Sequence, residues 1–289
     1  TFTMFNFKKK NKWIRFYSLD TGVVELHPIF PARRLKRKWR KDALKQEQAK
    51  EEKKCPALKA SALWNRMMNL DSPDAPDSLW SHAATCPALD AIMDSGYIIP
   101  APADFIIQLD GSGNFEWRSE TLFYGGRYVT AHIPEQTEGM RNLVNQQKDV
   151  LDYTIKMELP WRVQAHKDIV FIQQNIAYWD EERFSVPTGI VDPQYSYEIN
   201  CQLFWHITEP GEYLIKAGTP LVQWIPIHRD ILNSKGVDVM IETANADDLH
   251  NNEVMEYNRR KNFTENTTLS ERIKAQADIL KLNKNIERF

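Results

Sequence analysis

The middle of the chain alternates apolar and polar residues with the period of a β-strand. In YTIKMELPWRV, residues 153–163, every second side chain is apolar, which predicts one buried face that includes Trp161. The same pattern predicts that Trp205 lies on the buried face of a later strand. The period recurs in IVFIQQ (169–174), YEINCQLFWHI (197–207) and EYLIKAGTPLVQWIPI (212–227). Several such strands without helices between them predict an antiparallel sandwich or barrel.

Two further strand patterns upstream flank a glycine-rich turn. ADFIIQLD (103–110) and NFEWRSE (114–120) enclose GSG (111–113). Glycine reaches the positive φ of a tight turn without strain, so this stretch predicts a β-hairpin. A short strand is also expected in KWIRFYSL (12–19), and the prolines that follow it prevent a long helix there.

Both ends of the chain carry helical patterns. The segment 32–54 is charged except for an apolar row at four-residue spacing, Leu35, Trp39 and Ala43. In the segment 268–288 a narrow apolar stripe recurs among charged residues, at Leu269, Ile273, Ala277 and Leu280. A helix of this kind is marginal in isolation, so the stripe predicts an assembly helix that docks on another subunit or protein.

The predicted fold class is mainly β, with an antiparallel sandwich or β-clip-like core and helical N- and C-terminal extensions. We divide the chain into an N-terminal arm with a basic helix (1–54), a β-rich core (55–229) and a C-terminal helical arm (230–289). Two short helices near the start of the core begin at repeated CPAL motifs, where proline suits the first helical turn.

Composition narrows the classes of function. The 289 residues are 42% hydrophobic, which is enough for a packed core. The 37 basic and 39 acidic residues nearly balance, so the net charge does not indicate a nucleic-acid or membrane partner. Three widely spaced cysteines fit neither a disulfide framework nor a zinc knuckle. No segment has the apolar length of a membrane span or the apolar core of a signal peptide, so we expect a cytoplasmic protein.

Candidate metal ligands are dispersed. A histidine site would require His132, His166, His206 or His228 to converge from distant positions, and His206 is expected to face solvent from a strand. The sequence also contains no P-loop, no G-x-S-x-G and no Cys–His signature. We therefore predict no metal site and no cofactor.

A basic run lies in the N-terminal segment. Seven of the nine residues from 33 to 41 are basic: Arg33, Arg34, Lys36, Arg37, Lys38, Arg40 and Lys41. Such a run can contact phosphates and release counterions. Acidic residues follow it and neutralise it in part, so nucleic-acid contact, protein-partner contact and a solvated helix face are three open interpretations.

One stretch of the β-rich core resembles the dUTPase and dCTP-deaminase superfamily. GIVDPQY (189–195) and IKAGTPLVQWI (215–225) are similar to the G-h-h-D-x-x-Y hairpin and the h-x-x-G-x-x-h-x-Q strand of those enzymes. The resemblance implies that Asp192, Tyr195 and Gln223 would line a nucleotide site. The superfamily's phosphate-binding motifs are absent from this sequence, so a dUTPase-like nucleotide-binding or nucleotide-hydrolysing enzyme is the alternative function, beside a turn without a catalytic role.

A second resemblance covers about residues 12 to 229. The order of WRV, VPTGIVD, FWHITEPG and IKAGTPLVQWIPI is similar to an uncharacterised protein family of bacteria and tailed phages. The upstream TCPALDAIMDSGYIIPAPADF resembles a segment of hypothetical proteins from large myophages, especially those of marine cyanobacteria. This resemblance implies a phage origin and no particular activity.

Together, these features predict a non-enzymatic phage protein, a structural or assembly component of the virion that acts through extended terminal arms. The expected partners are other virion proteins or copies of the chain itself, with nucleic acid as an open alternative at the basic run and no membrane. The expected location is the host cytoplasm and then the virion. A host-directed binding protein is the third interpretation.

Overall fold

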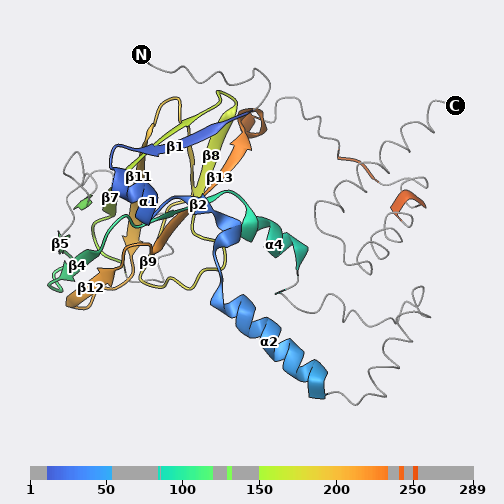
Figure 1. Cartoon of the computed structure of the whole chain (residues 1–289), viewed down its shortest axis with the longest axis horizontal. Coiled ribbons are helices and arrows are strands. Elements are labelled where there is room, and N and C mark those ends of the chain that lie inside the picture. The colour runs from blue at the N-terminus through green and yellow to red at the C-terminus, as the bar shows by residue number, and fades with distance from the viewer. Residues whose placement is uncertain are drawn as a thin grey trace. The chain divides into compact units, whose positions relative to one another are not determined.

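The computed structural model describes residues 12–53, 84, 86–119, 129–131, 150–233, 241–243 and 250–252. Within these ranges the chain is mainly β and its strands form three antiparallel sheets, which confirms the predicted fold class (Figure 1). Two compact units are distinguished, one of residues 1–38 with 92–237 and one of residues 39–91 with 238–289. All the strands below belong to the first unit.

The strands of the described ranges are short apart from β7, β11 and β13. They are β1 (Ile14–Ser18), β2 (Phe30–Pro31), β3 (Tyr97–Pro100), β4 (Phe105–Leu109), β5 (Phe115–Arg118), β6 (Val129–Ala131), β7 (Ile155–Ala165), β8 (Ile169–Gln174), β9 (Phe184–Ser185), β10 (Gly189–Val191), β11 (Glu198–Trp205), β12 (Gly211–Ile215) and β13 (Pro220–His228).

The helices given for the described ranges are α1 (Thr21–Leu26), α2 (Lys38–Lys53) and α4 (Pro87–Asp94), with the 3-10 helices η1 (Ala32–Arg34) and η4 (Arg229–Asn233). Among the described helices, none has the length and apolar character needed to cross a bilayer.

The first sheet is built around β7. β1 pairs antiparallel with its C-terminal half, so that Ser18 lies opposite Trp161, and β6 pairs with its N-terminal end. β11 also pairs with β7, with Cys201 opposite Met157, and β9 lies beside β11. Every second residue of β7 from Ile155 onward is buried, which confirms the predicted phase.

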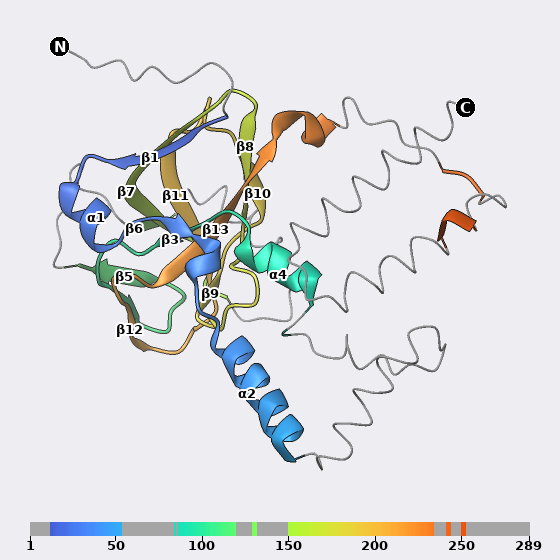
Figure 2. The ribbon, with the colours of Figure 1, turned by 45° about the vertical axis from the view of Figure 1, so that its right-hand side comes forward.

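The second sheet has the strand order β10, β8, β13, β3, β2. β8 and β13 form its centre, with Ile172 opposite Ile225, and both run beside β7 and β11 of the first sheet in Figure 2. β2 closes one side through Phe30, which lies opposite Ile98 of β3. In the described part of the chain, β10 forms the other edge.

The third sheet contains the predicted hairpin. β4 and β5 pair antiparallel, and β12 adds to the other side of β4. Gly111 and Gly113 of the connecting turn have φ of 84° and 91°, a region that favours glycine. Asp110 stabilises the same turn, because its Oδ1 accepts a hydrogen bond from the Ser112 amide at 2.7 Å. The hairpin prediction is therefore confirmed.

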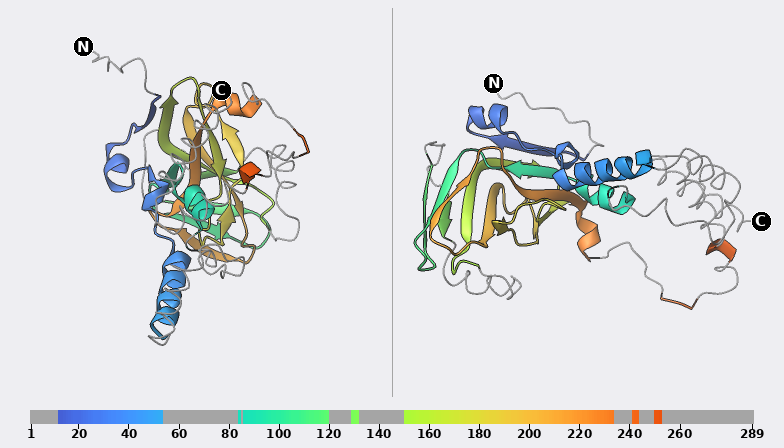
Figure 3. Two further views of the ribbon diagram at one scale, coloured as in Figure 1. Left: turned by 90° about the vertical axis from the view of Figure 1, so that its right-hand side faces the viewer. Right: turned by 90° about the horizontal axis from the view of Figure 1, so that it is seen from below.

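One hydrophobic core joins the sheets of the first unit, whose stacked strands Figure 3 shows from two sides. Trp205 is fully buried in this core and Trp161 is 2% exposed, so the predicted burial of both indoles is confirmed. Tyr197 precedes β11 and is 56% exposed, which places it outside the buried face that the alternation assigned to it. The strand itself begins only at Glu198.

The predicted boundary of the N-terminal arm is wrong. The sequence places residues 1–54 outside the β core, but β1 pairs along β7 and β2 pairs with β3. Residues 14–31 thus complete two sheets of the first unit, and the division between units falls after Lys38. An edge strand has unpaired backbone groups that another segment can satisfy, and no local sequence signal marks which segment does so.

The basic helix also begins later than its apolar row predicts. α2 starts at Lys38, whereas Leu35 lies before it in an extended conformation, with φ −73° and ψ 115°. There Leu35 packs against a small cluster of Ala32, Ile98 and Ile176. Packing in the β unit therefore decides the conformation of Leu35.

Candidate functional site

The turn between β10 and β11 holds the first predicted site residue, Asp192. Its backbone carbonyl accepts hydrogen bonds from the amides of Tyr195 at 3.0 Å and Ser196 at 2.9 Å. Its carboxylate Oδ1 accepts a further bond from the amide of Gln194 at 3.0 Å. An aspartate that bonds the amide two residues ahead forms an Asx turn, so the local sequence itself favours this tight turn.

Arg229, the first residue of η4, clasps the same carboxylate. Its Nη2 donates to Asp192 Oδ1 at 2.7 Å and its Nη1 donates to Oδ2. Arg229 is held in turn, because its Nε donates to the carbonyl of Lys167 at 3.0 Å. The hydrogen bond from Arg229 lowers the pKa of Asp192, and Asp192 raises the pKa of Arg229. The pair fastens the turn to the end of β13.

This ion pair predicts a pH-dependent stability. A carboxyl with a lowered pKa in the folded chain contributes stability above its ordinary value of 3.8 and loses it as the pH falls through the lowered pKa. We expect Asp192→Asn to unfold at lower urea concentration than the parent at neutral pH. The gap should narrow below pH 3.8 and at high salt, because both side chains are partly exposed. Urea titrations followed by circular dichroism measure it, and a gap independent of pH would contradict the ion pair.

Exposed apolar side chains lie on the elements that carry this ion pair. Tyr195 is 88% exposed although its turn is held by several hydrogen bonds. We define the Tyr195 surface as the exposed apolar residues of β10, the turn and η4: Ile190, Tyr195, Tyr197, Ile231 and Leu232. This surface adjoins the edge strand β10, which Figure 2 labels beside β8.

Gln223, the third residue of the nucleotide-site resemblance, is fully buried on β13. Its Nε2 donates to the carbonyls of Ile92 at 2.9 Å and Ser95 at 2.7 Å. Its Oε1 accepts a bond from the amide of Ala177 at 3.0 Å. The side chain therefore links three backbone segments through its carboxamide.

The structure does not bring the three residues of the resemblance together. Gln223 lies five residues before His228, which corresponds to about 17 Å along a strand, and Asp192 is bound just beyond that end of β13. Both carboxylate oxygens of Asp192 accept bonds from Arg229, whereas Tyr195 points into solvent. Asp192 and Tyr195 lie in the same turn, whereas Gln223 is buried elsewhere in the unit and bonds backbone groups there.

The basic run divides into side chains with internal partners and exposed ones. Arg37 is 6% exposed and donates to the carbonyls of Ala177 at 2.7 Å and Met93 at 3.2 Å. Arg40 pairs with Asp90 at 2.7 Å. The remaining side chains of the run are exposed: Arg33, Arg34, Lys36, Lys38 and Lys41. Arg37 thus binds protein carbonyls, and only the exposed residues are free to meet a polyanion or an acidic partner.

The histidines take two different places. His166 Nδ1 and His228 Nε2 approach the carboxylate of Asp168 at 3.4 Å and 3.9 Å. His206 is half-buried after β11, where its Nε2 lies 2.8 Å from Ser185 Oγ, so the expectation that it faces solvent is wrong. No group of His, Cys, Asp or Glu among the described residues has the geometry of a metal site. Burial also raises the pKa of the Cys201 thiol, which keeps that sulfur protonated.

Three predicted features lie outside the described residues. They are the helix at the first CPAL motif, which begins at Cys55, then His132, and the assembly helix of residues 268–288, with Leu269, Ile273, Ala277 and Leu280.

The described residues define a mainly β protein whose most exposed aromatic side chain stands on a tightly bonded turn. No family model, no curated protein and no solved structure matches this chain. Sequence reasoning found Asp192 and Tyr195 but missed Arg229, which follows Asp192 by 37 residues. No local pattern links the two residues, because their contact depends on the pairing of β10 and β13 with β8.

Proposed function

We propose that this chain is a non-enzymatic protein of a tailed phage, a structural or assembly component of the virion that acts by binding other proteins. The Tyr195 surface is the observation that carries the proposal. The partners would be other virion proteins or further copies of the chain, first in the host cytoplasm and then in the particle.

The chemistry of the Tyr195 surface suits a protein interface. Tyrosine presents a broad apolar ring with a polar tip, loses few rotamers on binding and is enriched in protein interfaces. Here the ring stands on a turn that Asp192 and Arg229 already hold in place. Because a preformed loop loses little conformational entropy on binding, the surface is suited to docking.

The neighbouring edge strand adds a second means of association. β10 pairs with β8 alone among the described strands, so its other side carries backbone groups available for another strand. Ile190 on β10 is 48% exposed and would be covered by such a strand. β-Augmentation combines backbone hydrogen bonds with side-chain pockets, and both elements occur here within a few residues.

The geometry favours this function over nucleotide hydrolysis. A dUTPase-like site would require Asp192, Tyr195 and Gln223 to face one ligand, whereas Gln223 is buried and Asp192 is bound by Arg229. A carboxylate in a bidentate ion pair is a poor base, because protonation would cost it both bonds. The nucleotide alternative therefore gains no support from the described residues.

The test is incorporation of variants into phage particles. In phage carrying Tyr195→Ser together with Ile231→Ser, we expect the copies of this protein per purified particle, or the yield of particles, to fall about tenfold, since two exposed anchors of the interface are lost. Quantitative mass spectrometry of purified particles and plaque titres measure the two quantities.

Leu26→Ser is the matched control. Leu26 ends α1 and is 73% exposed, and Figure 2 shows α1 on the side of the β unit away from β10, so this variant should incorporate normally. The proposed function would be refuted if purified parent particles lacked the protein and if phage without its gene assembled equally well. Normal incorporation of the double variant would refute the role of the Tyr195 surface.

A further inference from the structure

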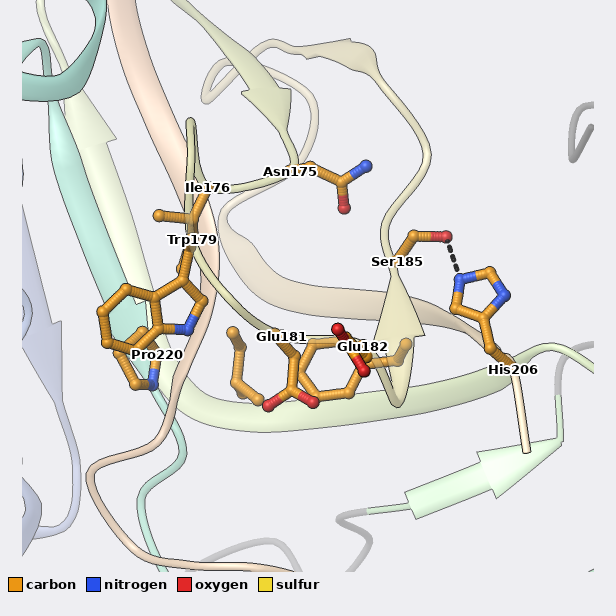
Figure 4. Close-up of a pocket in the computed structure, with 10 residues that line it drawn as sticks. Asn175, Ile176, Trp179, Glu181, Glu182, Ser185, His206 and Pro220 are labelled. Atoms are coloured by element: carbon orange, nitrogen blue, oxygen red, sulfur yellow. Dashed lines mark hydrogen bonds between the residues drawn. The ribbon is translucent and has the colours of Figure 1, made fainter. Parts of the chain in front are cut away.

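A cavity of about 620 Å³ lies at the other end of β11 from the Tyr195 surface. Tyr197 directly precedes β11 and His206 directly follows it, so about 25 Å of strand separates the two sites. Figure 4 shows Trp179 and Pro220 on one side of the cavity, Ser185 and His206 on the other, and two glutamates between them. Its size is that of a site for one small ligand.

The wall that carries Trp179 is held in a specific conformation. The segment 175–183 follows β8, and within it Tyr178 has φ of 55°, a left-handed conformation that non-glycine residues adopt rarely. Ala177 is bound from two sides, since its amide donates to Gln223 and its carbonyl accepts from Arg37. A strained residue next to a doubly anchored one is typical of a preformed ligand site.

Of the two glutamates in the cavity, Glu181 is paired with an arginine and Glu182 is not. Glu181 is neutralised by Arg183, whose Nε and Nη2 donate to its two carboxylate oxygens at 2.8 Å and 2.6 Å. Glu182 is exposed and has no hydrogen bond or ion pair with another described residue. Its carboxylate is therefore available to accept bonds from a ligand.

Ser185 and His206 provide groups of another kind. Ser185 Oγ and His206 Nε2 lie 2.8 Å apart and share a hydrogen bond. A hydroxyl both donates and accepts, whereas a carboxylate only accepts. Together with the indole of Trp179, the lining offers an apolar platform, an acceptor and a mixed donor and acceptor. Among its described residues there is no Arg or Lys to bind a phosphate.

We propose that this cavity binds a neutral hydroxylated ring, a sugar unit of a glycan. The apolar face of the sugar would stack on the indole of Trp179, while its hydroxyls donate to Glu182 and exchange bonds with Ser185. A phosphate would find no Arg or Lys among the described lining residues, and a simple cation would use only Glu182 and the indole. The mixture of polar groups thus fits a ligand with several hydroxyls. This binding is separate from the proposed assembly function.

The test is a titration of the full chain with methyl glycosides of glucose, galactose, mannose and N-acetylglucosamine, followed by saturation-transfer NMR. At least one glycoside should bind in the millimolar range, as is usual for a single small polar ligand. Glu182→Gln should weaken that binding about tenfold, because a charge-assisted hydrogen bond is replaced by a neutral one. Trp179→Ala should abolish it.

Glu209→Gln is the matched control, since Glu209 is exposed and does not line the cavity, and it should bind like the parent. Because Trp179 also packs on the cluster around Ile176, the melting temperature of Trp179→Ala must be measured, and Glu182→Gln keeps the test independent of folding. Absence of binding for all four glycosides at about 10 mM would overturn the proposal. So would tighter binding of tetramethylammonium, which would make the cavity a cation site.

Discussion

Replacing Trp205 with alanine is expected to lower the free energy of unfolding by about 3–5 kcal/mol. The indole is fully buried, stacks at 6.1 Å on Phe184 and meets the ring of Tyr213 edge-on at 6.1 Å. Its removal would take away both aromatic contacts and leave a cavity between β9, β11 and β12. Trp161→Ala should cost a similar amount, because that indole is 2% exposed. Urea unfolding followed by tryptophan fluorescence and circular dichroism measures both.

Tyr197→Ala is the control for this prediction. Tyr197 stands just before the same strand but is 56% exposed, so its loss should change the free energy of unfolding by less than about 0.5 kcal/mol. If Trp205→Ala were as stable as the parent, the register of β11 would be shifted by one residue. Such a shift would move every side chain of the strand to the opposite face.

Gln223→Leu is expected to cost about 3 kcal/mol although it replaces a polar side chain in the core by an apolar one of similar size. The leucine would leave the carbonyls of Ile92 and Ser95 and the amide of Ala177 without their present partner. Each buried backbone group without a hydrogen bond costs about 1–3 kcal/mol, and the gain from burying an apolar group offsets part of the sum. The same urea titration measures this loss.

The control is Gln202→Leu on β11, where the glutamine is only half-buried, so the change should cost less than about 1 kcal/mol. Gln223→Leu should also weaken glycoside binding, because Gln223 anchors the wall that carries Trp179 through Ala177. A Gln223→Leu variant with the parent's stability would show that the carboxamide does not stabilise the fold. Gln223 would then be a candidate for ligand binding.

In the Asp192 turn, the local sequence predicts the backbone hydrogen bonds and leaves the partner of the carboxylate open. The letters DPQYS predict a turn with an aspartate at its start, and the observed bonds from the amides of Gln194, Tyr195 and Ser196 are of that local kind. The partner of its carboxylate was beyond prediction, because Arg229 reaches Asp192 only through two strand pairings. The ion pair of Asp192 thus depends on one residue that is distant in the sequence.

In the basic run, tertiary contacts distinguish residues that the sequence cannot tell apart. Its seven charges look alike in sequence, yet Arg37 is buried against backbone carbonyls while Arg33 and Lys36 are exposed. A guanidinium has five donors and can satisfy several carbonyls at once, so it can be buried where carbonyls converge. Only the fold decides where they converge.

The sequence alone was sufficient to predict the alternating strands β7, β8, β11 and β13, the burial of Trp161 and Trp205, and the hairpin at Gly111 and Gly113. These features depend on residue alternation and on the conformational range of glycine, which are properties of neighbours in the chain. Three features could be seen only in the tertiary structure: β1 and β2 complete the sheets, Arg229 pairs with Asp192, and Gln223 and Arg37 both hydrogen-bond the backbone of Ala177. Each of these depends on backbone or charged groups that satisfy partners far away in sequence, and the free energy of such contacts exists only once the sheets have brought them together.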